Sequence, residues 1–280
     1  MNFPINKSDE EVKLLMARAV EMMRREQFEV AFSDFLTPRE QRIFYVAAAT
    51  EGQAERLFFY GGARGAERRR AVLLPEWSLP EDCGEPFSAA RDETLYSLAA
   101  AGTWSPADAV TVLCLRGSGF VTLSHRDWMG GLLALGTERT VIGDIFVQDE
   151  YSALVFVTPH IAEYLTQSLH HVGSDTVRAE PVTLPESYEI VHNYERIEAT
   201  VASPRLDGVV HALTNLSRAD AATLVKNGLA ERNYFPETRP DIVIEDGDLL
   251  SLRGYGKYII DSTNAVTRRG RNRLVARKFI

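Results

Sequence analysis

Between residues 110 and 184, short apolar runs suited to strands alternate with two patterns of helical spacing. The order is strand, helix, strand, strand, helix, strand, which is the split βαβ arrangement. It predicts a small α/β sandwich in the middle of the chain. The six predicted elements are Val110 to Leu115, His125 to Leu135, Asp144 to Val147, Ala153 to Val157, a helix opened by Pro159, and Thr176 to Leu184.

The chain of 280 residues is long enough for two or three domains. Its content of 45% hydrophobic and 25% charged residues excludes disorder, collagen and a simple coiled coil as descriptions of the whole chain. We expect a multi-domain α+β protein. Its predicted parts are an N-terminal α/β domain at 1–85, a central ferredoxin-like or RNA-recognition-like domain at 86–185, a third domain at 186–265, and a basic tail at 266–280.

The first 85 residues predict two helices and then two short strands. Thr37 and Glu40 have the spacing of a capping box, with Pro38 suited to the first turn. Strands are expected from Leu57 to Tyr60 and from Arg68 to Leu74. A proline-rich stretch over residues 75–90 then predicts a boundary loop.

Several classes of protein are excluded by what the chain lacks. Cys83 and Cys114 are too few for a disulfide scaffold or a four-ligand zinc site. The N-terminal residues have no basic-then-apolar signal pattern. The longest apolar run, from Ala109 to Leu115, is far below the ~20 residues of a membrane helix. We therefore expect a soluble, cytoplasmic protein with no membrane partner, no metal and no small-molecule cofactor.

Charge is distributed unevenly along the chain, whose net charge is −8. Residues 204–280 hold 13 basic and 9 acidic side chains, a net charge of +4, and the remainder carries −12. The last thirty residues hold eight basic side chains against Asp261 alone. An acidic body with a basic end predicts a polyanionic partner at that end, and a solvated charged tail is the open alternative.

Three short motifs follow one another in the C-terminal third. They are Arg205-Leu206-Asp207, Ser217-Arg218-Ala219-Asp220-Ala221, and Gly247-Asp248-Leu249. In this order they resemble the S-four RNA-binding domain, a module named from a ribosomal protein, over about residues 203–262. The chain departs from the family pattern at residues 230–234, where the family favours a Val and a Gly after the Asn, which affects the hairpin geometry.

The same segment predicts a phosphate-binding face from its residue types. Helices are expected to begin at Ser203 and Ser217, and helix N-termini favour anions. Arg205 and Arg218 would oppose the helix dipoles there, at a cost of up to about 1 kcal/mol, which an anionic ligand explains better than stability does. Pairing of Arg205 with Asp207 or Asp220 is the alternative. The candidate RNA-binding residues are Arg205, Ser217, Arg218, Lys226, Arg253, Lys257, Arg268, Arg269, Arg271 and Arg273, of which those in the basic tail would lie along a nucleic-acid backbone without folding alone.

A second conspicuous motif is Ser124-His125-Arg126-Asp127. A protein-kinase loop is excluded, because no Asn follows Asp127 by four residues and the other kinase motifs are absent. A hydrolase triad is not implied by residues adjacent in sequence. Ser124 and Asp127 predict a helix cap, and His125, Arg126 and Arg139 form a candidate secondary RNA surface, with a packing role as the alternative.

The run from Ser124 to Ile145, upstream of an S-four segment, resembles the YlmH family of bacterial ribosome-associated RNA-binding proteins. Residues 35–41, 60–62 and 67–71 resemble that family's N-terminal region. The resemblance implies binding to rRNA or tRNA on the large ribosomal subunit that carries peptidyl-tRNA, in rescue or quality control of stalled translation. It also implies a genomic association with cell division, and a related cyanobacterial and chloroplast group is labelled as photosystem-associated.

The leading hypothesis is therefore a non-catalytic RNA-binding factor. One alternative is an RNA-modifying enzyme, because S-four domains are often attached to pseudouridine synthases. Such enzymes need a catalytic Asp in an arginine-rich motif, and Arg126-Asp127 is the only upstream echo of one. The other alternative is an adaptor protein in cell division or photosystem assembly.

Overall fold

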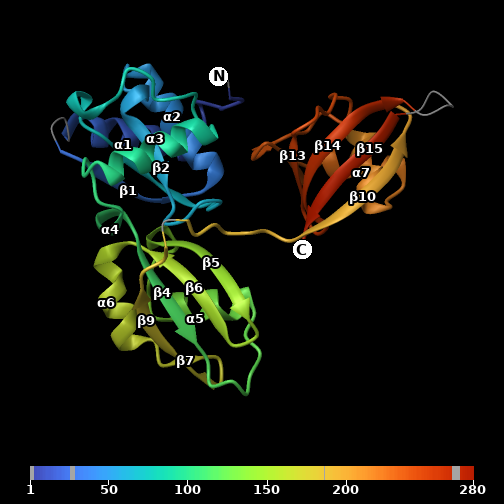
Figure 1. The fold of residues 1–280 in the computed structure, drawn as a ribbon. Coiled ribbons are helices and arrows are strands. Elements are labelled where there is room, and N and C mark those ends of the chain that lie inside the picture. Colours follow the sequence, from blue (N-terminus) through green and yellow to red (C-terminus); the bar gives the residue numbers. More distant parts are fainter. Residues whose placement is uncertain (1–2, 26–28, 186, 267–271) are drawn as a thin grey trace. The chain divides into compact units, whose positions relative to one another are not determined.

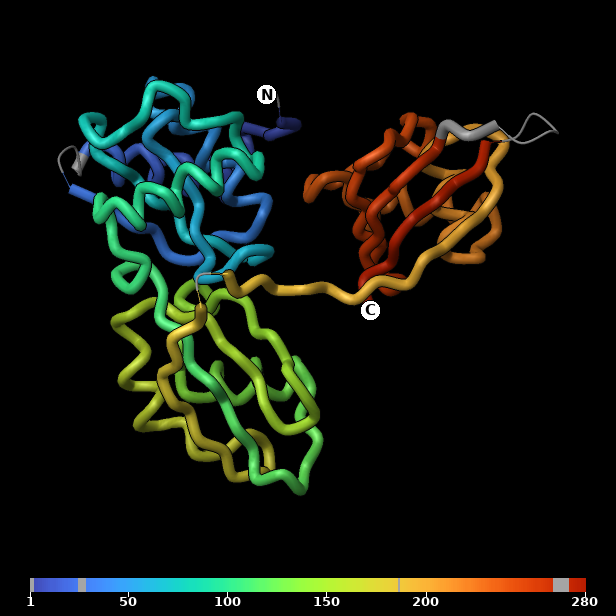
Figure 2. Tube along the Cα trace, in the orientation of Figure 1, coloured from blue at the N-terminus to red at the C-terminus, as the bar shows by residue number. Residues whose placement is uncertain are grey.

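The computed structural model describes residues 3–25, 29–185, 187–266 and 272–280 (Figure 1). The chain divides into two compact units, Met1–Ile190 and Val191–Ile280. Both contain helices and antiparallel sheets, so the predicted α+β class is confirmed. Figure 2 follows the chain through each unit in turn.

The first unit begins with two helices packed on a three-stranded sheet. Their apolar faces meet the sheet in one buried cluster that includes Val12, Ile43 and Leu73. The sheet has the order β1-β3-β2 and is antiparallel. The elements are α1 (Glu10–Arg25), β1 (Ala31–Leu36), α2 (Pro38–Thr50), the short 3₁₀ turn η1 (Ala54–Arg56), β2 (Leu57–Tyr60) and β3 (Arg69–Leu73). The predicted strands and the capping box of Thr37 and Glu40 are confirmed, while β1 was not predicted.

A connecting segment leads from this layer to the next. It holds the 3₁₀ turn η2 (Glu76–Ser78) and the helices α3 (Ala89–Ala100) and α4 (Pro106–Ala109). The helix α3 packs on β2, and Leu95 and Trp104 are buried beside Phe58 and Tyr60. The part of this segment from residue 86 onward was predicted to belong to the central domain, whereas Leu95 and Trp104 pack with residues of the N-terminal sheet.

The second layer of the first unit is a four-stranded antiparallel sheet with the order β5-β6-β4-β9. This is the strand order of a split βαβ sheet, and all six predicted elements form. They are β4 (Thr111–Arg116), α5 (His125–Ala134), β5 (Ile142–Asp149), β6 (Ser152–Val157), α6 (Pro159–Ser168) and β9 (Arg178–Val182), with the 3₁₀ turn η3 (Arg139–Val141) and the short strands β7 (His171–Val172) and β8 (Asp175–Thr176) between them.

The four-stranded sheet buries both of its faces. Leu113 and Leu115 on β4 pack with the helices α5 and α6, whereas Val112 and Cys114 point to the opposite side. That opposite side shares one apolar cluster with residues of the first sheet such as Phe58. The predicted division at residue 85 is therefore not visible as a break in packing, because the two sheets share a core.

The second unit is a six-stranded antiparallel sheet with two helices on one face (Figure 1). The strand order is β10-β15-β14-β13-β11-β12. Val209 on α7 and Val225 on α8 are buried with Leu250, Ile260 and Leu274 of the sheet. The elements are β10 (Tyr194–Val201), α7 (Leu206–Thr214), α8 (Arg218–Lys226), β11 (Ala230–Arg232), β12 (Phe235–Pro236), β13 (Leu249–Leu252), β14 (Gly256–Val266) and β15 (Asn272–Phe279).

The segment predicted as a separate basic tail at 266–280, unlikely to fold alone, belongs in its C-terminal part to the sheet of the second unit. Residues Asn272–Phe279 form β15, which pairs with β10 on one side and with β14 on the other. Leu274 and Ala276 are fully buried, while Arg273 and Arg277 point to the other face. Because the segment is rich in basic residues, the alternation of buried and exposed side chains typical of a strand was not recognised in the sequence. Arg268, Arg269 and Arg271 lie outside the described residues.

Candidate nucleic-acid interface

Two arginines of the second unit converge on one carboxylate. The Nε atoms of Arg205 and Arg218 each lie 3.4 Å from an oxygen of Asp207. The carboxylate also accepts a hydrogen bond from the backbone N–H of Gly208 at 2.9 Å. The Asp207 side chain is 12% exposed, whereas the two arginine side chains are 45% and 52% exposed. The trio therefore holds two guanidinium groups in place and leaves an excess of one positive charge at the surface.

The prediction that Ser203 caps a helix was wrong. Arg205 occupies the N-cap position of α7, and its side chain makes no capping hydrogen bond. The backbone N–H groups of Leu206 and Asp207 donate to the carbonyls of Ile242 and Pro240, both at 2.9 Å. A distant loop thus supplies the acceptors that a cap would supply. This helix start does not present unpaired N–H groups to an anion.

The second predicted helix start is confirmed. Ser217 is the N-cap of α8, and its hydroxyl accepts a hydrogen bond from the backbone N–H of Asp220 at 3.1 Å. The same hydroxyl donates to the Asp220 carboxylate at 2.6 Å. Ser217 therefore fixes the first turn of α8, which carries Arg218 beside Arg205.

Three further predicted residues lie near the end of α8 and the hairpin that joins β13 to β14. Lys226 is exposed in the last turn of α8. Arg253 and Lys257 line a shallow pocket together with Gly228 and Leu229, the residues that follow the helix. The backbone N–H of Arg253 donates to the Leu229 carbonyl at 2.9 Å, which fastens the hairpin to this corner. These cations form a group of their own.

Arg273 is not brought together with Arg205 and Arg218. It lies on β15, on the face of the sheet opposite to the buried Leu274. Its guanidinium forms an ion pair with Glu198 of β10 at 2.6 Å. The predicted set is thus divided between the helix side and the opposite side of the second unit.

In the first unit, the predicted secondary surface separates into two exposed residues and one that is engaged with the main chain. His125 and Arg126 are exposed in the first turn of α5, which Ser124 and Asp127 cap as predicted. Arg139 donates hydrogen bonds to the carbonyls of Ile142 and Gly143. Burial lowers the pKa of Arg139 to about 10, so the group stays charged at neutral pH. These contacts favour the packing role for Arg139, which was the alternative to RNA binding.

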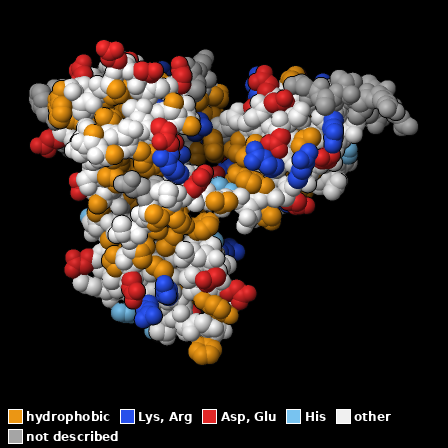
Figure 3. Space-filling model, in the orientation of Figure 1, with side chains coloured by type: hydrophobic (Ala, Val, Ile, Leu, Met, Phe, Trp, Pro, Cys, Tyr) orange, Lys and Arg blue, Asp and Glu red, His pale blue; other side chains and the backbone are white. Residues whose placement is uncertain are grey.

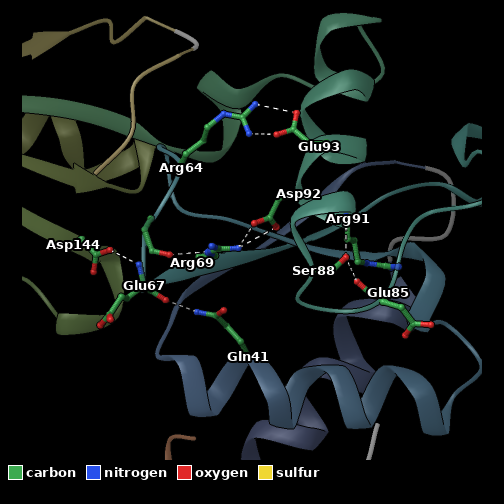
Figure 4. A network of polar contacts seen from close by, with 11 residues as sticks. Gln41, Arg64, Glu67, Arg69, Glu85, Ser88, Arg91, Asp92, Glu93 and Asp144 are labelled. Carbon is green, nitrogen blue, oxygen red and sulfur yellow. Dashed lines mark hydrogen bonds and ion pairs between the residues drawn. The ribbon is translucent and has the colours of Figure 1, made fainter. Parts of the chain in front are cut away.

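A polar cluster joins the two sheets of the first unit (Figure 4). Asp144 on β5 accepts hydrogen bonds from the backbone N–H groups of Glu67 at 2.7 Å and Arg68 at 3.3 Å. Gln41 of α2 donates to the Glu67 carbonyl at 2.7 Å. The Arg68 guanidinium donates to the carbonyls of Phe35, Arg139 and Ile142. Burial raises the pKa of Asp144, an effect that these N–H donors oppose.

The sequence reasoning did not assign a role to this cluster. The run Arg68-Arg69-Arg70 was a candidate for an RNA surface, with a solvated charged face as the alternative, and Asp144, 76 positions from Arg68, stood only in a family-like motif. The adjacent Gly143 explains part of the motif, because a Cβ atom there would lie 2.6 Å from the Phe35 ring. The motif therefore encodes the junction of the two sheets.

The first turn of α5 has an unusual titration environment. Desolvation of the His125 ring, followed by the nearby Arg139 cation, lowers its pKa, and Asp144 opposes this only in part. The lowered pKa means that the folded protein disfavours the charged imidazolium form of His125.

Comparison with known proteins places these features in a family. Residues 114–186 match the model described as the putative RNA-binding domain in YlmH. Over 251 residues the chain is 31% identical to the ribosome-associated protein quality control protein P2 of Bacillus subtilis. That alignment covers 89% of this chain and 88% of the relative. The chain belongs to the YlmH family. The matched segment of this YlmH-family chain contains β4 to β9 with α5 and α6.

A solved structure is also similar to this YlmH-family chain. The cell division protein ylmH from Streptococcus pneumoniae is 15% identical, with a TM-score of 0.46, and the match covers 65% of this chain and 96% of that one.

Among the residues that the structure describes, no helix is long and apolar enough to cross a membrane. The same residues hold no group of three His, Cys, Asp or Glu side chains placed to bind a metal ion.

Proposed function

We propose that this protein is a non-catalytic RNA-binding factor that acts on the ribosome. It binds rRNA or tRNA on the large subunit in the rescue or quality control of stalled translation. Membership of the YlmH family supports this role, as does the name of the Bacillus subtilis relative. The observation that carries it is the pair of arginines held by Asp207, within a segment whose motifs resemble the S-four domain.

The geometry of the arginine pair suits RNA phosphates. Asp207 orders both guanidinium groups in advance, which reduces the conformational entropy that binding would otherwise cost. About half of each side chain remains exposed, and a guanidinium can donate two parallel hydrogen bonds to one phosphate. Lys226 and Arg253 would extend the contact along the backbone, whereas Lys257 lies on the opposite side of the sheet. Such contacts favour recognition of RNA shape over base sequence.

The hydrogen bonds of Asp127 support a non-catalytic role for the protein. Arg126-Asp127 is similar to the Arg-Asp pair of the pseudouridine-synthase motif. The Asp127 carboxylate accepts hydrogen bonds from the Ser124 hydroxyl at 2.6 Å and from the Ser124 backbone N–H at 2.9 Å. These bonds lower the pKa of Asp127 and place the carboxylate over the helix start. The capping role of Asp127 explains why an acidic residue stands at this position.

Co-sedimentation with purified ribosomes and separated subunits across a salt series tests the proposal. We expect binding to the large subunit that falls steeply as salt rises, because phosphate contacts release counterions. The variant R205A/R218A should bind several-fold more weakly. The matched control is R18A/R24A, which removes two exposed arginines from α1 and should bind as the wild type does.

Two results would contradict the proposal at different levels. Wild-type binding that R205A/R218A leaves unchanged would exclude the arginine pair as the contact. Failure to sediment with any subunit at low salt would exclude the ribosomal role. Modified uridines formed in rRNA by the purified protein would favour the enzyme, and a pull-down that survives nuclease would favour the adaptor.

A further inference from the structure

The second unit has a sheet face that its helices do not cover. We call it the outer sheet face and define it by the side chains of β10, β14 and β15 that point away from the buried Leu274 and Ala276. Figure 3 shows basic side chains beside apolar and acidic ones on the side of this unit that carries these strands. The members are Tyr194, Arg196, Glu198, Lys257, Ile259, Asp261, Arg273, Val275, Arg277 and Phe279.

Aromatic rings gather at one end of this face. Tyr194 and Phe279 are directly opposite in the β10–β15 register, and their ring centroids are 4.9 Å apart. His192 adds a third ring, 5.4 Å from Phe279. All three residues are partly exposed, and none belongs to the buried core of the unit. Cross-strand aromatic pairs stabilise a sheet, but rings that serve only this purpose need no cations around them.

Cations alternate with these rings. Lys257 Nζ lies 4.9 Å from the centroid of Phe279 and 5.2 Å from that of Tyr234. The Arg277 guanidinium lies 4.9 Å from the centroid of Tyr194. Lys257 therefore contacts two rings, one of them on the outer sheet face, and Arg277 contacts another ring of that face.

The carboxylates on these strands serve to position arginines. Asp261 accepts from Arg277 Nε at 2.9 Å. Glu198 pairs with Arg196 at 2.9 Å and with Arg273 at 2.6 Å. Each of the three arginine side chains remains at least 42% exposed. With Lys257, the three strands present four cations against two carboxylates on this face.

We propose that the outer sheet face binds single-stranded RNA, an inference that rests on the proposed RNA-binding function. Unpaired bases stack on Tyr194 and Phe279, and the adjoining phosphates contact Lys257, Arg273 and Arg277. Interleaved rings and cations suit this occupant because every base has a π face and every nucleotide carries a phosphate. The arginine pair at Asp207 lies on the helix side of the unit, so the two surfaces serve different RNA segments.

Fluorescence anisotropy of the full-length protein with a fluorescein-labelled decauridine tests the inference. An abasic oligomer of the same length and charge measures the contribution of phosphates alone. We expect decauridine to bind more tightly than the abasic oligomer. The variant Y194L/F279L keeps apolar side chains in the sheet but removes both π faces, and it should weaken decauridine binding about tenfold.

The variant R205A/R218A separates this inference from the proposed function. It should bind decauridine within about twofold of the wild type, while its ribosome sedimentation falls. A wild-type protein that sediments with ribosomes but does not bind decauridine would overturn the outer-face inference alone. Equal binding of decauridine and the abasic oligomer, or equal binding by wild type and Y194L/F279L, would also overturn it.

A measurement on the wild type guards against a variant that does not fold. Decauridine that contains 4-thiouridine should crosslink under ultraviolet light to Tyr194, Phe279 or their neighbours on β10 and β15. Mass spectrometry identifies the modified peptides. Crosslinks confined to other elements would overturn the inference.

Discussion

The carboxylate of Asp144 accepts a hydrogen bond from the backbone N–H of Glu67 at 2.7 Å, across 77 positions of the chain. This bond joins β5 of the four-stranded sheet to the segment that precedes β3 of the three-stranded sheet. Because Asp144 is strongly desolvated there, its lone pairs depend on the backbone N–H groups of Glu67 and Arg68.

Asp144→Ala should destabilise the first unit by about 2 kcal/mol, since it leaves two partly buried N–H donors without their acceptor. All three tryptophans, Trp77, Trp104 and Trp128, belong to this unit, so tryptophan fluorescence during urea unfolding reports on it selectively. Glu163→Ala, on the exposed side of α6, is the control and should leave the midpoint unchanged. Equal midpoints for Asp144→Ala and wild type would show that the cluster does not join the sheets.

Arg218→Lys should weaken ribosome binding about fivefold although the charge is kept. An ammonium group cannot donate two parallel hydrogen bonds in the fixed plane of a guanidinium. Sedimentation at one moderate salt concentration measures the change. Arg18→Lys on α1 is the matched control. If Arg218→Lys binds as tightly as the wild type, the contact depends on net charge alone.

The stability of the first unit should fall as the pH drops below about 6.5, the pKa of an unperturbed histidine. Because the pKa of His125 is lowered in the folded protein, the unfolded chain takes up this proton first as the pH falls. Above this range both states are neutral and His125 contributes no slope. Urea midpoints at pH 7.5 and 5.5, followed by tryptophan fluorescence, should therefore differ less in His125→Gln than in the wild type.

His160→Gln on α6 controls for the loss of any histidine. The comparison between variant and wild type isolates His125 from carboxylates such as Asp144, whose raised pKa contributes a slope of the opposite sign. Identical pH dependence in His125→Gln and wild type would remove His125 as the source of the effect.

Leu274→Ala should destabilise the second unit by about 2–5 kcal/mol, because the side chain is fully buried on β15, which pairs with β10 and β14. Limited proteolysis should cleave residues 191–280 faster, while the tryptophan signal of the first unit keeps its midpoint. Val275→Ala, one residue away on the outer sheet face, should have a much smaller effect. Equal protection of the two variants would indicate that β15 is dispensable for the fold.

Local signals were sufficient to predict some elements from the sequence. The capping boxes at Thr37 and Ser124 depend on residues three positions apart, and both form as expected. The order of the split βαβ elements was predicted because apolar periodicity and turn residues agree along residues 110–184. The approach of Arg205 to Asp207, weighed as an alternative, follows from their spacing across one helix start.

Other features depend on contacts between distant segments. The start of α7 could not be located at Arg205, because its acceptors come from residues 240 and 242. The shared core of the two sheets in the first unit and the cluster around Asp144 arise only when segments distant in sequence meet, as Glu67 and Asp144 do across 77 positions. Along β15 the buried Leu274 and Ala276 alternate with side chains on the other face. The arginines in this segment concealed the alternation.

The register of β10 and β15 has a mechanical consequence. Tyr194 begins one strand and Phe279 ends the other, so the chain enters and leaves this antiparallel seam at the same corner. Tension applied across that corner would open the interstrand hydrogen bonds one pair at a time, like a zipper, instead of loading them all together in shear. The edge-to-face rings of Tyr194 and Phe279 lie at the end that opens first, so an RNA base seated on them would also hold the seam closed.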